Sequence, residues 1–72
     1  MSEQRKIINF TVAAVNEFAE QLQLSVREAF HYLLQYKGIA FLKENYDAEH
    51  LQSFDTIIDD LRILCRNNGG YL

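Results

Sequence analysis

A chain of 72 residues with ten acidic and seven basic side chains, a net charge of -3 and 49% hydrophobic residues has room for one domain. The apolar fraction argues against disorder, the mixed charges lack the basic stripe that nucleic acid requires, and one cysteine excludes an internal disulfide. The polar start, followed by an apolar stretch that Asn9 and Asn16 interrupt, matches neither a signal peptide nor a membrane span, so we expect a single cytoplasmic domain over residues 1–72.

The first predicted helix runs from about Glu3 to Gln23. At about 100° per residue, its apolar side chains cover an arc of roughly 200°, about twice the minimum for a helix that packs on one core. Phe10 and Ala14 widen this arc at its margin. The helix is therefore either central to the domain or in contact with another chain, and in the second case we expect Phe10 and Ala14 to contact a second copy of the chain or another protein.

A second helix is predicted to start after Ser25, because Ser25 and Glu28 have the spacing of a capping box. Gly38 is expected to end it in the left-handed conformation that glycine adopts most easily. The stripe of this helix that should face the core contains Val26, Ala29, Phe30, Leu33 and Tyr36.

A short helix over Ile39–Asn45 should follow, and Asn45-Tyr46-Asp47 should break it, with Asp47 as a cap for the next element. The last helix is predicted from about Ser53 to Asn68, before Gly69-Gly70. Its apolar arc of roughly 120° suits one core and contains Phe54, Ile57, Ile58, Leu61, Leu64 and Cys65. The expected fold is an all-α bundle of three main helices plus one short connecting helix.

Few residues invite a chemical role. Asp47 and His50 could place two metal ligands on one side of a helical turn, but a site needs three or four ligands. A hydrogen bond of His50 within the loop is the simpler interpretation, and both stay open. Asp59 and Asp60 diverge by about 100° on a helix, so they do not face each other as a paired-carboxylate acid–base site would require. Cys65 falls inside the apolar arc, so we expect a buried thiol of low reactivity. We predict no enzyme, cofactor or metal site.

Two tyrosines and one isoleucine lie away from the centres of the apolar stripes. Tyrosine combines an apolar body with a polar tip, so it suits the margin of a core and equally an interface. The core margin is the default interpretation, and Tyr32 and Tyr46 are the better interface candidates. Ile63 lies among polar residues on the far side of the last helix, where it is either a single exposed aliphatic or a contact of the tail or a partner. The candidate interaction residues are Phe10, Ala14, Tyr32, Tyr46, His50 and Ile63.

Short elements spread over most of the chain carry a family resemblance: Leu24-Ser25, Glu28-Ala29, Tyr36-x-Gly38, Phe41-Leu42, Tyr46-Asp47, His50 and Asp59-Asp60. With them the chain resembles the bacterial domain of unknown function 3791 family of small helical proteins. Some members are encoded beside proteins that resemble ADP-ribosyltransferases. The resemblance thus implies an accessory or antitoxin-like partner of an ADP-ribosyltransferase-like protein, and it implies no catalytic residue.

The sequence therefore predicts a non-catalytic protein-interaction module that binds another protein or itself as a homodimer, without nucleic acid or membrane. The alternative is a small DNA-binding regulator of helix-turn-helix type, because Ser25 opens a helix after a short joint. That helix offers only Arg27 and Lys37 as basic residues, and Glu28 lies where phosphate contacts are expected.

Overall fold

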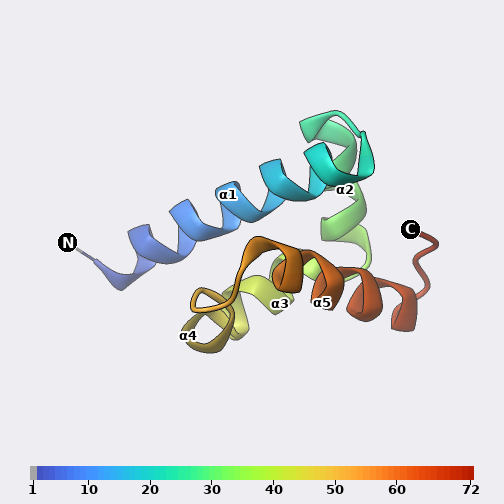
Figure 1. Cartoon of the computed structure of the whole chain (residues 1–72). Coiled ribbons are helices and arrows are strands. Elements are labelled where there is room, and N and C mark those ends of the chain that lie inside the picture. Colours follow the sequence, from blue (N-terminus) through green and yellow to red (C-terminus); the bar gives the residue numbers. More distant parts are fainter. Residues whose placement is uncertain (1) are drawn as a thin grey trace.

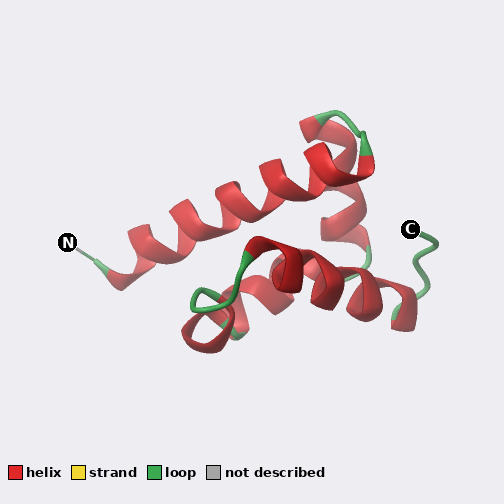
Figure 2. Ribbon diagram, in the orientation of Figure 1, coloured by secondary structure: helices red, strands yellow, loops and turns green. Residues whose placement is uncertain are grey.

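The described part of the chain, residues 2–72 of a computed structural model, folds into five helices and contains no strand (Figures 1 and 2). They are α1 (Glu3–Leu22), α2 (Val26–Gln35), α3 (Gly38–Glu44), α4 (Tyr46–Glu49) and α5 (Phe54–Asn67). In Figure 1, α1 lies over α5, and α2 descends from the end of α1 toward α3. The predicted all-α bundle is confirmed, with one short helix more than expected.

The joint between α1 and α2 is defined by local hydrogen bonds. Gln23 takes a left-handed conformation with φ of 58°, which ends α1. The Glu28 backbone N–H donates to Ser25 Oγ at 3.0 Å, and the Ser25 N–H donates to Glu28 Oε1 at 2.9 Å. This is the predicted capping box, and it fixes the residue at which α2 begins.

The predicted left-handed conformation of Gly38 is wrong. Lys37 takes it instead, with φ of 72°, and Gly38 is the buried first residue of α3. A Cβ atom on Gly38 would lie 2.7 Å from Leu33 Cδ2 and 3.2 Å from Cys65 Sγ. Glycine is therefore needed here because two helices approach its Cα closely, not because of its φ angle.

The predicted break at Asn45-Tyr46-Asp47 is reduced to Asn45 alone, which separates α3 from α4. The Asn45 carbonyl accepts from the Glu49 N–H at 2.8 Å, so the chain turns into a new helix at once. Asp47 lies inside that helix, and no side chain caps α4. The prediction of Asp47 as a cap is thus wrong.

α5 begins and ends as the sequence predicts. Ser53 Oγ accepts from the Thr56 N–H at 3.3 Å at its start. At its end Gly69, with φ of 101°, and Gly70 donate to the carbonyls of Arg66 and Cys65, which is a Schellman motif. This motif turns the tail back toward α2.

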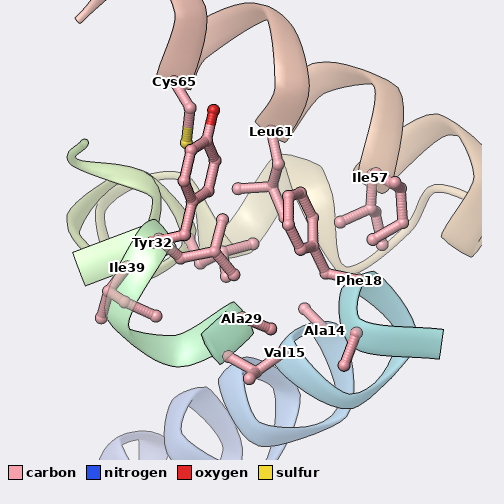
Figure 3. Close-up of a cluster of buried hydrophobic side chains, with 13 residues drawn as sticks. Ala14, Val15, Phe18, Ala29, Tyr32, Ile39, Ile57, Leu61 and Cys65 are labelled. Carbon is pink, nitrogen blue, oxygen red and sulfur yellow. The ribbon is translucent and has the colours of Figure 1, made fainter. Parts of the chain in front are cut away.

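The core lies between α1, α2, α3 and α5 (Figure 3). Its largest fully buried side chains are Phe18, Leu33, Leu42, Ile57, Ile58, Leu61 and Cys65. The arc predicted for α5 is buried at Ile57, Ile58, Leu61 and Cys65, whereas Phe54, at its first turn, is 41% exposed. The stripe predicted for α2 is displaced, because Tyr32 faces the core while Val26 and Phe30 do not.

Candidate functional site

Two of the six candidate interaction residues belong to the core. Ala14 has no exposed surface, and Tyr32 is 5% exposed. The Tyr32 ring stacks on Phe18 at 5.9 Å between centroids, and its hydroxyl accepts from the Leu72 N–H at 2.9 Å. The prediction that Ala14 and Tyr32 contact a partner is therefore corrected: small Ala14 lets the helices approach closely, and Tyr32 holds the tail.

Three other candidates meet in one cluster. The Phe10 ring packs edge-on against Tyr46, with centroids 5.5 Å apart, and Tyr46 stacks on His50 at 4.3 Å. His50 Nδ1 lies 2.6 Å from the Tyr46 carbonyl oxygen, which is the loop hydrogen bond considered from the sequence. Phe10 and Tyr46 are half-buried. The cluster therefore fastens α4 to α1 and leaves His50 at the surface.

Ile63, the sixth candidate, is exposed to 58% on the outer side of α5. Leu72, at the end of the tail beyond α5, makes its polar contacts with Tyr32, Arg62 and Arg66, and Ile63 stays exposed. Exposure of a single aliphatic side chain is ordinary in folded proteins. Ile63 by itself therefore defines no site.

A larger apolar surface lies on α1 and α2, and we call it the α1–α2 face. It consists of Ile8 and Val12 on α1 with Val26, Phe30 and Leu34 on α2, all between 42% and 54% exposed. On each helix these residues are four apart, so they form one stripe per helix. Five large apolar side chains gathered on two contacting helices are more than the scattered exposure usual for a monomer.

A hollow of about 400 Å³ lies between the two stripes. Val12 and Val15 form its α1 side, Val26 and Phe30 form its α2 side, and Thr11, Asn16 and Arg27 complete its lining. The Thr11 hydroxyl donates to the Ile7 carbonyl at 2.8 Å, so this polar group is already satisfied. The walls of the hollow therefore offer a mainly apolar contact surface.

Sequence reasoning found the surplus of apolar surface on α1 and assigned it to the wrong margin. Phe10 and Ala14 were expected outside, whereas the structure places Ile8 and Val12 outside. An arc of roughly 200° permits either rotation of the helix. Ala14 on α1 and Ala29 on α2, both with no exposed surface, lie within the shared core.

Glu49 is a functional candidate that the sequence did not single out. It is 8% exposed, and its Oε1 has no hydrogen-bond partner among the described residues. Burial, with a hydrogen bond and the negative charge of Asp60, raises the pKa of Glu49 to about 7. A proton held between Glu49 and Asp60 would satisfy the orphaned oxygen and link α4 to α5.

The remaining reactive groups have structural surroundings. Cys65 is a fully buried thiol, and burial raises its pKa to about 11. The hydrogen bonds to Ser25 lower the pKa of Glu28. Within residues 2–72, no group of three or more His, Cys, Asp or Glu side chains is arranged to hold a metal ion. No helix in that range combines the length and apolarity needed to cross a membrane.

Fold and surface together define a small helical protein with one open apolar face. The family model described as "Protein of unknown function (DUF3791)" matches residues 9–68, and the chain belongs to this family. The resemblance drawn from the sequence is thus confirmed. Neither a curated protein nor a solved structure matches the chain.

Proposed function

We propose that this protein is a non-catalytic protein-interaction module that binds its partner through the α1–α2 face. The observation that carries the proposal is the apolar hollow that Val12, Val26 and Phe30 line, with Ile8 and Leu34 exposed one turn further along the same two helices. Burying such side chains contributes about 25 cal/mol per Å² of apolar surface. Interfaces draw most of their affinity from a few such anchors, and Phe30 has the largest side chain of the five.

The proposed contact surface differs from the one predicted from the sequence. Phe10 and Tyr46 now serve to attach α4, while the partner contact moves to the opposite margin of α1. Both kinds of partner, a second copy or another protein, remain part of the proposal. An accessory or antitoxin-like role toward an ADP-ribosyltransferase-like protein in the bacterial cytoplasm is compatible with such a face.

A DNA-binding regulator has weaker support. The outward side of α2, which would enter the major groove, carries Val26, Phe30 and Leu34, and Arg27 is the single arginine or lysine within α2. Base and phosphate contacts need polar and cationic side chains. Salt-dependent binding of the protein to DNA, lost in Arg27→Ala, would favour the regulator over the interaction module.

The proposal is tested with immobilised protein and extract of the native host. Wild type is compared with a Val12→Asp/Phe30→Asp variant and with Ile63→Asp, which places one such charge on a similarly exposed aliphatic residue outside the face. We expect a defined partner to bind wild type and Ile63→Asp and to be lost from the double variant. Light scattering on the same three proteins detects self-association.

Circular dichroism shows whether the variants remain folded, which we expect because Val12 and Phe30 are about half exposed. A partner retained equally by all three proteins would overturn the proposed face. The same holds for an oligomer that persists in the double variant.

A further inference from the structure

The two hollows on the α1–α2 side of the molecule are lined by charged residues of one sign, Arg5 and Arg27. Among the described residues, Arg27 is the only charged side chain that lines the apolar hollow. A second hollow of about 570 Å³ lies one turn further toward the start of α1, beside Ile8, and Arg5 is the only charged residue among the described ones that line it. Since the whole chain has a net charge of -3, this positive rim is a local feature of the face.

The two guanidinium groups are available for a partner. Arg5 and Arg27 are exposed, and neither side chain takes part in the hydrogen bonds found within residues 2–72. Arg62 and Arg66, by contrast, both donate to the Leu72 carbonyl at 2.9 Å. A free guanidinium beside an apolar surface favours a carboxylate, which it can bind through two parallel hydrogen bonds.

The shape of the face suits a helix. Arg5 and Ile8 line one hollow and Val12 and Asn16 line the next, at steps of three or four residues along α1, so a third helix laid along α1 can contact both hollows. At about 1.5 Å per residue, the distance along α1 from Arg5 to Asn16 is roughly 16 Å, or about three turns. One amphipathic helix of that length can reach both arginines.

We infer that the occupant of the α1–α2 face is an acidic amphipathic helix of another protein. Its apolar stripe lies over Val12, Val26 and Phe30, and carboxylates beside that stripe bind Arg5 and Arg27. The inference rests on the proposed function and adds the chemistry of the partner.

A second copy of the chain is the poorer occupant. A two-fold contact through this face would place the same patch on both sides. Arg5 and Arg27 of one copy would then meet a surface that, among the residues lining the two hollows, contains no carboxylate. Like charges that approach across an interface disfavour association.

The experiment uses a displayed library of 14-residue amphipathic helices with a fixed leucine stripe. The positions beside the stripe vary among Glu, Gln and Lys. The library is selected against wild type and against an Arg5→Glu/Arg27→Glu variant. The matched control is Lys37→Glu/Lys43→Glu, which changes the net charge equally at exposed lysines that line other hollows.

We expect wild type and the lysine control to enrich Glu beside the stripe. Synthetic peptides with Glu should bind them about fivefold more tightly than peptides with Lys, as two exposed ion pairs permit. The arginine variant should reverse this preference, and added salt should weaken it. The Val12→Asp/Phe30→Asp variant should enrich no helix.

The other outcomes separate the inference from the proposed function. Helices that bind the face without charge preference, or with a preference for Lys, would overturn the acidic partner and leave the interaction module intact. A wild-type dimer that Phe30→Asp dissociates and Ile63→Asp does not would likewise replace the acidic helix with a second copy. A monomer that enriches no helix over the double variant would overturn both.

Discussion

The two sides of this molecule treat their exposed surface in opposite ways. On the α5 side, polar contacts close the structure: Tyr32 and Arg62 hold Leu72, and Glu49 meets Asp60. On the α1–α2 face, apolar side chains stand open, and the arginines beside them have no partner within the described residues. One side is fastened by the chain itself, and the other leaves large apolar side chains exposed.

This difference shows how a very small domain can divide its apolar surface. A chain of this length buries only about 60% of the surface that its unfolded form exposes. Here the core takes one side of α1, and five exposed large apolar side chains lie on α1 and α2, while Leu51, Phe54, Ile63 and Tyr71 are exposed elsewhere. The following predictions test whether substitutions on the two sides of the molecule change the free energy of unfolding by different amounts.

The largest expected effect separates two phenylalanines. Phe18→Ala should destabilise the protein by about 3–5 kcal/mol, because Phe18 is fully buried. Phe30→Ala should cost less than about 1 kcal/mol, because Phe30 is 42% exposed. Urea denaturation followed by circular dichroism measures both. Similar losses for the two variants would make the α1–α2 face part of the core.

The second effect concerns pH. The pKa of Glu49 is raised to about 7 in the folded protein from 4.5 in the free side chain. Between pH 4.5 and about 7, this carboxyl therefore holds a proton in the folded state that it has lost in the unfolded state. Its contribution to the free energy of unfolding is complete below about pH 4.5 and is lost as the pH rises through about 7.

Urea denaturation of wild type and Glu49→Gln at several pH values measures how the free energy of unfolding declines as the pH rises. Glu49→Gln should remove the decline, because an amide does not titrate and can donate to Asp60. Glu44→Gln, at an exposed position of α3, should keep the wild-type slope. Parallel curves for wild type and Glu49→Gln would show that the carboxyl pair does not fasten α4 to α5.

A smaller effect is expected at the tail. A Cβ atom on Gly70 would overlap the Tyr32 hydroxyl and lie 2.8 Å from the Cys65 carbonyl oxygen. Gly70→Ala should therefore displace the tail and cost about 2 kcal/mol. Hydrogen exchange of the Leu72 amide should become faster, since its bond to Tyr32 is lost. Asn67→Ala, exposed at the end of α5, serves as the control; unchanged exchange in Gly70→Ala would count against a fastened tail.

The smallest effect compares two helix caps. Ser25→Ala should cost about 1 kcal/mol, because it breaks the capping box that positions α2 beside α1. Ser2→Ala removes a single 3.2 Å bond to the Arg5 N–H at the exposed start of α1 and should cost less. Thermal unfolding of both variants gives the order. A larger loss at Ser2 would mean that the first turn of α1 contributes more than its exposure suggests.

The sequence was sufficient where a structure depends on neighbours along the chain. Ser25 with Glu28 and Ser53 with the residues after it define helix starts, and Gly69-Gly70 defines an end. These contacts span a few residues, so residue type and spacing determine them. The arc of α5 was also readable, because only one rotation of that helix buries Ile57, Leu61 and Cys65 together.

Tertiary structure decided the features that need partners from distant segments. Because the apolar arc of α1 is wide, the sequence did not determine which side of this helix faces the core. Packing in the folded protein decides it, since Ala14 and Phe18 are buried in the core that α1 shares with α2 and α5. Tyr32 became a core residue because Leu72, forty positions away, returns to its hydroxyl. Neither contact leaves a periodic signal in the sequence.

The sequence by itself thus determined an all-α chain with defined helix ends and more apolar surface than its core uses. Only the folded structure decided that Ile8, Val12 and Phe30 form the open surface and that Glu49 meets Asp60. Helix ends follow from short-range hydrogen bonds. The choice of which apolar side chains are buried follows from packing among helices, and that energy depends on all of them at once.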